Sequence, residues 1–197
     1  MEGQLMNLMP VLQKILPFLV ATSFNEIQPP KADQWQIVND QTERGGASTG
    51  RVTDVANGIE FAGVLGSIPG NDGKPVAFSL ARIKYRPTSN AKGVRVALSS
   101  LTPVTALILV APPLPERQRP TTTYQKAIVL KGDGEIQTFK ASWSEFEATV
   151  RGKKAKDAPK LDPTKIDSWA LQVTRSSQPG QKRYEPIEFQ IRVLIQE

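Results

Sequence analysis

The chain has 197 residues, enough for one large domain or a domain with an extension, and it contains neither cysteine nor histidine. The first absence excludes disulfides, thiol nucleophiles and zinc–thiolate sites, and the second excludes a Ser-His-Asp triad and histidine-ligated metals. Hydrophobic residues make up 39% of the chain, which is enough to bury a core, and the net charge of +6 favours anionic partners only mildly.

An apolar run occupies residues 4–22, and Pro10 and Pro17 interrupt its helical pattern. A bilayer-spanning helix needs about 20 nearly uncharged residues, and a signal peptide begins with a positive cluster where this chain has Glu2, so neither is expected. We interpret the run as an amphipathic, partly helical segment that lies on a membrane or binds a partner. The alternative is a segment folded against its own domain. The candidate contact residues are Leu5, Leu8, Leu12, Ile15, Leu16 and Leu19.

Pro29 and Pro30 are typical of a linker, so residues 1–33 are predicted to be an extension and residues 34–197 the folded domain. Strands are then expected, in chain order, at 35–38, 59–65, 76–85, 94–98, 105–111, 124–130, 136–143, 166–174 and 186–196. The segment 105–111 is apolar on both faces, which favours a central strand covered on both sides. About nine short strands separated by turn signals predict an all-β sandwich of jelly-roll type.

The last strand shows the clearest alternation. Its inward residues are predicted to be Ile187, Phe189, Ile191, Val193 and Ile195. Period-two alternation indicates a strand with one face on a core and the other in water. We therefore expect this C-terminal strand to close the sandwich as a late-arriving edge.

A polar loop with paired glycines follows the first predicted strand. Its candidate partner-binding residues are Asn39, Asp40, Gly45, Gly46 and Ser48. Paired glycines allow positive φ angles or a close approach of two backbone segments. The alternative interpretation is a tight turn in which Asn39 and Asp40 bond to local backbone amides.

A second candidate is the basic segment 151–165. Its cationic residues include Arg151, Lys153, Lys154, Lys156, Lys160 and Lys165. Such a loop can contact RNA, acidic lipid headgroups or an acidic protein, although many charged loops are simply solvated. No aromatic residues are interleaved with the cations, so stacking on nucleic-acid bases is not expected.

Three tryptophans and two glutamates raise sugar chemistry as a hypothesis. Trp35, Trp143 and Trp169 could form a platform for sugar rings, but alternation places two of the three at core positions, which favours the core for the group. Glu145 and Glu147 invite a glycosidase interpretation, yet no second carboxylate is placed across a cleft from them. No phosphate-binding loop and no calcium-type acidic run is present, so we predict no enzyme, no metal and no cofactor.

The order of several motifs resembles the complex I intermediate-associated protein 30 (CIA30) family. The matching residues are Asn39-Asp40, Gly45-Gly46 and Ser48, Phe61 and Gly63, Trp143 and Phe146, Arg151-Gly152, Leu161-Asp162 and Ile166, and Phe189, Ile191 and Val193. The resemblance covers residues 34–196. It departs from the family at Gln41–Arg44, which replaces a Gly-Val-Met, and at Ser99-Ser100, where a Gly-Asp-Gly is expected.

The resemblance implies a galactose-binding-like β-sandwich that acts as a non-catalytic assembly factor. Its implied partner is a subunit of a respiratory or photosynthetic membrane complex, with peripheral membrane contact and no small-molecule substrate. The implied location is the cytoplasmic or stromal side of a thylakoid or respiratory membrane, and secretion is not expected. Two alternatives stay open. One is an RNA-binding accessory factor that uses the basic segment, as in a plastid relative, and the other is a carbohydrate-binding module.

Overall fold

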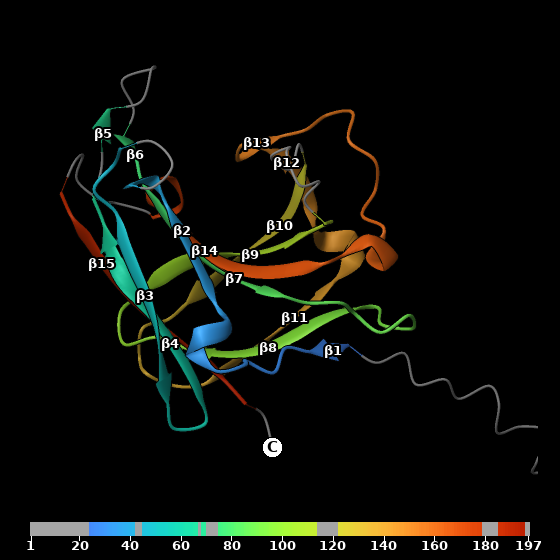
Figure 1. Ribbon diagram of the computed structural model, residues 1–197, viewed down its shortest axis with the longest axis horizontal. Coiled ribbons are helices and arrows are strands. Elements are labelled where there is room, and N and C mark those ends of the chain that lie inside the picture. The colour runs from blue at the N-terminus through green and yellow to red at the C-terminus, as the bar shows by residue number, and fades with distance from the viewer. Residues whose placement is uncertain are drawn as a thin grey trace, which may run out of the picture.

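Two β-sheets pack face to face in the computed structural model, which describes residues 24–41, 45–66, 68–69, 75–113, 122–178 and 185–195 (Figure 1). A small third sheet pairs β5 (Ile68–Pro69) with β6 (Pro75–Val76). Short 3₁₀ turns connect the strands: η2 (Ala32–Gln34), η3 (Trp143–Glu145), η4 (Pro163–Lys165) and η5 (Arg175–Ser177). The predicted all-β jelly-roll sandwich is confirmed.

The six-stranded sheet has the order β1-β8-β15-β4-β3, with β11 also paired to β8. Its strands are β1 (Asn25–Glu26), β3 (Thr49–Val55), β4 (Gly58–Leu65), β8 (Gly93–Ser99), β11 (Gln137–Ser142) and β15 (Ile187–Leu194). β11 follows one side of β8 along six residues. The other side of β8 is shared, because β1 pairs in parallel with Val94 and Arg95 while the end of β15 pairs with residues 97–99.

The seven-stranded sheet has the order β13-β12-β10-β9-β14-β7-β2. Its strands are β2 (Gln36–Asn39), β7 (Phe78–Lys84), β9 (Val104–Ala111), β10 (Thr123–Leu130), β12 (Glu147–Val150), β13 (Lys153–Lys154) and β14 (Ser168–Thr174). β9 is the middle strand, as the apolar segment 105–111 predicted. The prediction that both of its faces are covered is wrong in part, since Leu107 on the outward side is only half-buried.

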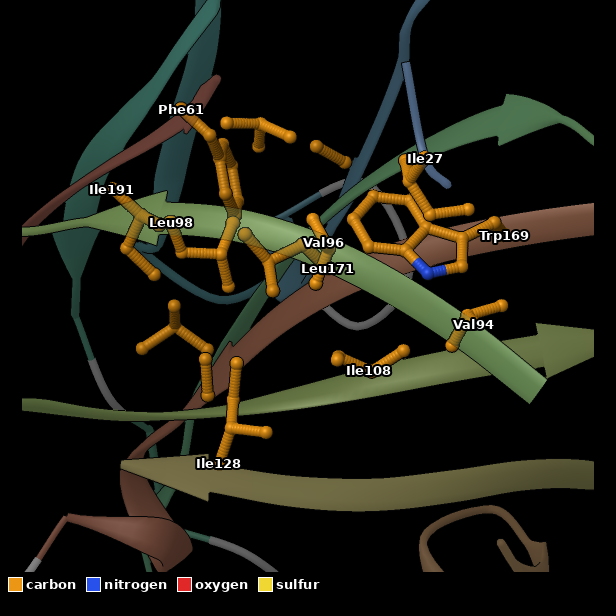
Figure 2. Packing of buried hydrophobic residues seen from close by; sticks show 14 of the residues in the cluster. Ile27, Phe61, Val94, Val96, Leu98, Ile108, Ile128, Trp169, Leu171 and Ile191 are labelled. Carbon is orange, nitrogen blue, oxygen red and sulfur yellow. The ribbon is translucent and has the colours of Figure 1, made fainter. Parts of the chain in front are cut away.

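The hydrophobic core fills the space between the two sheets (Figure 2). Trp169 and Leu171 of β14 and Phe61 and Ile191 of the opposite sheet are fully buried. Phe61 also makes an edge-to-face contact with Phe189, with ring centroids 4.9 Å apart. Burying each such large apolar side chain contributes about 1.5–3 kcal/mol. The apolar inward faces of the two sheets, which carry these side chains, therefore hold the layers together.

The C-terminal strand β15 confirms most of its predicted alternation. Ile187, Phe189, Ile191 and Val193 are at most 8% exposed. Two expectations are wrong. β15 lies inside its sheet, between β8 and β4, rather than at an edge. Ile195 is 46% exposed, because the strand ends at Leu194 and the Ile195 backbone N–H turns to bond the carbonyl of Asn57.

Part of the predicted linker belongs to the sandwich instead. Asn25 and Glu26 form β1 beside β8, and the backbone N–H of Ile27 donates to the carbonyl of Arg95 at 2.8 Å. The Ile27 side chain is 1% exposed and is a member of the core. The described sandwich therefore includes a strand that begins nine residues before residue 34, where the sequence placed the start of the domain.

Some sequence predictions fall on residues outside the described ranges. These are the candidate contact residues of the apolar segment, Leu5, Leu8, Leu12, Ile15, Leu16 and Leu19. Within the described residues, no helix has the length and hydropathy needed to cross a bilayer.

Candidate binding surfaces

The polar loop between β2 and β3 brings its predicted residues together, but it buries them. Asp40 and Ser48 are completely inaccessible to solvent and Asn39 is 7% exposed. One carboxylate oxygen of Asp40 accepts a hydrogen bond from the backbone N–H of Ser48 at 3.0 Å, and the Asp40 carbonyl accepts from the N–H of Gly46 at 3.0 Å. Asp40 therefore holds the loop closed in the way that the turn interpretation describes. A partner role for these side chains stays a prediction.

The two glycines of this loop meet different requirements. Gly45 has a φ of 69°, a conformation that side chains with a Cβ rarely adopt. Gly46 lies so close to Asp40 that a Cβ there would stand 2.4 Å from the carboxylate carbon. The paired glycines thus make room for a buried carboxylate.

A buried arginine, which the sequence did not single out, stabilises the same end of the sandwich. Arg175 is 6% exposed, and its guanidinium donates to the carbonyls of Leu65, at 3.1 Å, and Glu185. Burial lowers the pKa of this guanidinium from its ordinary value. Arg175 thereby joins the start of η5 to the end of β4 and to the segment that leads into β15. A lone arginine after an alternating strand carries no pattern by which sequence could have assigned this role.

The basic segment is structured over part of its length and lies on the surface. Arg151 and Gly152 both have positive φ, at 51° and 76°, which makes a tight hairpin turn between β12 and β13. The segment also contains η4, so it is not one continuous loop as predicted. The cationic residues Arg151, Lys153, Lys154, Lys156 and Lys160 are all exposed. They are therefore accessible to an anionic partner.

Carboxylates offset some of this positive charge. Lys154 pairs with Glu147 at 3.1 Å, and Lys165 pairs with Asp162 at 3.4 Å. Exposed pairs of this kind contribute little to stability. Arg151 and Lys153 at the hairpin, and Lys156 and Lys160 after it, lie outside these two pairs.

The three tryptophans belong to the interior, as predicted for the group. Trp35, Trp143 and Trp169 are 8%, 9% and 0% exposed. Trp35 packs edge-on against Trp169 with centroids 5.9 Å apart, and the indole N–H of Trp143 donates to the carbonyl of Ala91 at 2.7 Å. None of them is available as a platform for a sugar ring.

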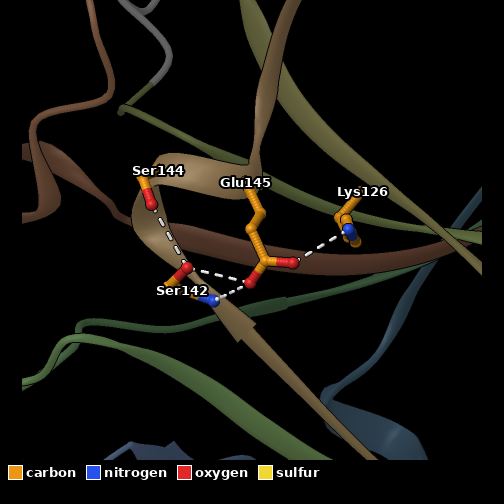
Figure 3. A network of polar contacts seen from close by, with 4 residues as sticks. All are labelled: Lys126, Ser142, Ser144 and Glu145. Carbon is orange, nitrogen blue, oxygen red and sulfur yellow. Dashed lines mark hydrogen bonds and ion pairs between the residues drawn. The ribbon is translucent and has the colours of Figure 1, made fainter.

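Glu145 is occupied in a local network rather than poised for proton transfer (Figure 3). Its carboxylate accepts from the backbone N–H and the hydroxyl of Ser142, each at 2.8 Å, and from the ammonium of Lys126 at 3.0 Å. These bonds, led by the Ser142 backbone N–H, lower the pKa of Glu145 to about 2. A general acid at neutral pH needs a raised pKa, so Glu145 is unsuited to that role.

A small open hollow is lined by Lys84, Tyr85, Arg86 and Asp167. Arg86 and Asp167 neutralise each other across it at 2.9 Å, and burial raises the pKa of Tyr85 to about 12. A phenol with that pKa is protonated at neutral pH and is a poor base. Within the described residues, no three Asp or Glu side chains group closely enough to hold a metal ion.

The fold and these surfaces define a β-sandwich domain of the jelly-roll class. The sequence model of the family described as Complex I intermediate-associated protein 30 (CIA30) matches residues 23–191, so the chain belongs to that family. The match begins beside β1, in agreement with the core position of Ile27. The comparison with curated proteins gives no match.

Solved structures with a similar fold include carbohydrate-binding modules. The family 11 module from Clostridium thermocellum, in complex with a β-1,3-1,4-mixed-linked tetrasaccharide, aligns with a TM-score of 0.53 and 12% identity, covering 82% of this chain and 86% of that one. The family 11 module of the cellulase Lic26A-Cel5E of the same organism gives a TM-score of 0.52 and 11% identity, covering 82% and 87%. At these identities the likeness shows the fold alone.

Proposed function

We propose that the chain is a non-catalytic assembly factor that holds a protein subunit of a respiratory or photosynthetic membrane complex while that complex is built. The observation that carries the proposal is the match to a complex I-associated family over residues 23–191. The side chains described above are consistent with binding rather than catalysis, since the candidate glutamates are paired with cations and the tryptophans are buried. The alternative of a carbohydrate-binding module has less support, because buried tryptophans cannot form its aromatic platform.

The apolar segment of residues 4–22 is proposed to contribute a second contact, with the membrane or with the client. Its attachment point is fixed, because β1 starts at Asn25 and is hydrogen-bonded to β8. The Asn25 side chain also accepts from the hydroxyl of Thr88 at 2.7 Å. Whatever the segment binds would therefore be held close to this side of the sandwich. A location peripheral to the membrane is part of the same proposal.

The experiment is removal of residues 1–23, which spares β1. The shortened protein is expected to keep the thermal unfolding of the full chain but to leave the membrane fraction and lose its complex subunits. Co-fractionation of the shortened protein with membranes, at the level of the full chain, would contradict a role for the segment. Failure of the full chain itself to co-purify with any membrane-complex subunit would contradict the assembly-factor proposal.

The exposed basic hairpin supports RNA binding as a second candidate. Phosphate contacts by Arg151 and the neighbouring lysines would give an affinity that falls steeply with salt. A gel shift with single-stranded RNA, titrated with salt, tests this. No shift at low salt, or an unchanged shift in a variant with Arg151, Lys153 and Lys156 replaced by glutamine, would exclude the candidate.

A further inference from the structure

The two outward faces of the sandwich differ in chemical character. On the six-stranded sheet, Glu60 accepts a hydrogen bond from the side chain of Gln190 at 2.6 Å and lies 3.4 Å from the guanidinium of Arg192. On the same sheet Arg95 pairs with Glu26 at 2.8 Å. A polar, cross-linked surface of this kind is usual for the solvated side of an antiparallel sheet.

Apolar residues make up half of the outward positions on the strands β2, β7, β14, β9 and β10 of the seven-stranded sheet. Trp169 stands opposite Ile83 and Val110 in the register, and all three are buried in the core, so the residues that alternate with them point away from it. The outward apolar residues on these strands and on their neighbours β2 and β10 are Val38, Phe78, Leu80, Leu107, Leu109, Ala111, Ala127, Val129 and Ala170.

The larger of these side chains stand on both sides of β14. Leu80 of β7 and Leu107 of β9 both pair with Gln172 in the register, so the three form one row across the sheet. Both leucines are half-buried, and Val129 on β10 is 65% exposed. Neither leucine belongs to the core cluster between the sheets. Leu109 and Ala170, by contrast, are 8% and 3% exposed. The accessible part of this apolar surface therefore includes Leu80, Leu107 and Val129, and accessible apolar residues in the middle of a sheet are unusual for a solvated face.

The charge on this face is positive. Arg82 and Lys84 point outward from β7, and Arg82 bonds to the neutral side chain of Gln36. Among the outward residues of the described strands, Glu147 is the one carboxylate, and Lys154 neutralises it at 3.1 Å. Lys84 shares the hollow described above with Arg86 and Asp167, whose charges offset each other. Among the described residues, Arg82 and Lys84 therefore give this part of the face a net positive charge.

The outward apolar residues of β7 and those of β9 form two rows along the strands, and the spacing of these two rows suits an α-helix. β7 and β9 flank β14, so their leucines are two strand spacings apart, roughly 10 Å, which is about the diameter of a helix. Successive outward residues along a strand are about 7 Å apart, close to the roughly 6 Å rise between residues i and i+4 of a helix. An amphipathic helix lying along β14 could contact both rows.

We propose that the outward face of the seven-stranded sheet docks an amphipathic helix of the client protein, with apolar residues against Leu80 and Leu107 and acidic residues near Arg82 and Lys84. The proposal rests on the proposed function and names the part of the sandwich that performs it. A second copy of this chain would bring like charges together. The chain's own apolar segment carries Lys14 and no acidic residue between positions 4 and 22. Neither complements the positive charge of the face.

The test uses a synthetic peptide of roughly 18 residues, about five helical turns, built from leucine, alanine and glutamate, and a partner in which lysine replaces glutamate. Methyl NMR spectra of the full chain are recorded during titration with each peptide. The acidic peptide is expected to shift the methyl signals of Val38, Leu80, Leu107 and Val129. The basic peptide is expected to bind about tenfold more weakly.

Two matched variants each carry two glutamates, one variant on the outward face of the seven-stranded sheet and the other on that of the six-stranded sheet. Leu80→Glu with Leu107→Glu should weaken the acidic peptide about a hundredfold, because it adds like charge to a desolvated apolar contact. Val64→Glu with Leu194→Glu, on the half-buried outward side of the six-stranded sheet, should leave the affinity unchanged. Thermal unfolding and the dispersion of the NMR signals confirm that both variants fold. Equal binding of the two peptides, shifts at other methyls, or equal effects of the two variants would overturn the proposal.

A separate arm distinguishes this proposal from the assembly-factor proposal. The full chain and both variants are expressed in the source cells and the membrane-complex subunits that co-purify are quantified. Loss of these subunits in the Leu80→Glu/Leu107→Glu variant alone supports docking at this face. Retention of them in that variant overturns docking there and leaves the assembly function standing. Competition by the chain's own segment would appear as tighter peptide binding after removal of residues 1–23, and it would overturn the choice of a client helix as the occupant.

Discussion

At the scale of single residues, the polar loop between β2 and β3 buries a carboxylate. Asp40 is inaccessible to solvent, and its hydrogen bond to the Ser48 backbone is made possible by the absence of a side chain at Gly46. The sequence identified these residues as a group, because paired glycines after Asn-Asp are conspicuous. It could not show that the group points inward, since an Asx turn and a binding loop have the same residue types.

Gly46→Ala should lower the free energy of unfolding by about 1–3 kcal/mol, because its Cβ would overlap the Asp40 carboxylate. Gly45→Ala is the control, since no atom lies within 4 Å of its Cβ and only the positive φ opposes it. It should cost about 1 kcal/mol. Urea unfolding followed by tryptophan fluorescence measures both. An equal or smaller loss for Gly46→Ala would contradict the packing described for Asp40.

Glu145 makes stability depend on pH at the acidic end. Its pKa lies at about 2 in the folded chain, below the ordinary value of 4.5, so its ionised form stabilises the fold at all pH values above 4.5. That contribution is lost as the pH falls from 4.5 towards 2. The difference in unfolding free energy between the wild type and Glu145→Gln should therefore be constant around neutral pH and should fall towards zero near pH 2. A difference that persists unchanged at pH 2 would show that the carboxylate charge is not responsible.

At the scale of elements, the alternation of apolar and polar residues located the strands well but did not show which strands lie next to each other in a sheet. The pattern Ile187, Phe189, Ile191 and Val193 located β15, but nothing in it indicates that β8 and β4 lie on both sides. Ile195 continued the pattern and was assigned inward, although the sheet ends one residue earlier. The two-residue strand β1 is too short to show periodicity, and the nearby prolines suggested a linker. Pairing and strand ends depend on contacts far apart in the chain, which is why sequence did not give them.

The position of β1 gives a prediction about the domain boundary. Ile27→Ala should lower the free energy of unfolding by about 2–5 kcal/mol, because Ile27 is 1% exposed in the core. A protein starting at residue 24 should be as stable as the full chain. A protein starting at residue 34 should be destabilised by at least as much as Ile27→Ala, since it lacks β1 as well. Chemical denaturation compares the three, and equal stability of the two shortened proteins would place the boundary at residue 33 after all.

At the scale of the whole molecule, the class of fold was predictable and the binding face was not. The apolar residues on both faces of 105–111 were a sign of this outward face. Ile108 points into the core, so its neighbour Leu107 points outward. That signal was interpreted as a covered strand, since sequence cannot show whether a third layer exists. Similarly, Trp35, Trp143 and Trp169 were correctly predicted as core residues, which removes the sugar platform but does not identify the client.

The central claim is that this sandwich binds a client during assembly and does not remain in the finished complex. Native separation of membranes, followed by quantification of the chain in every fraction, tests it most directly. The chain is expected to migrate with incomplete assemblies of one respiratory or photosynthetic complex and to be absent from the mature form. Migration with the mature complex in stoichiometric amount, or with no complex subunit at all, would contradict it.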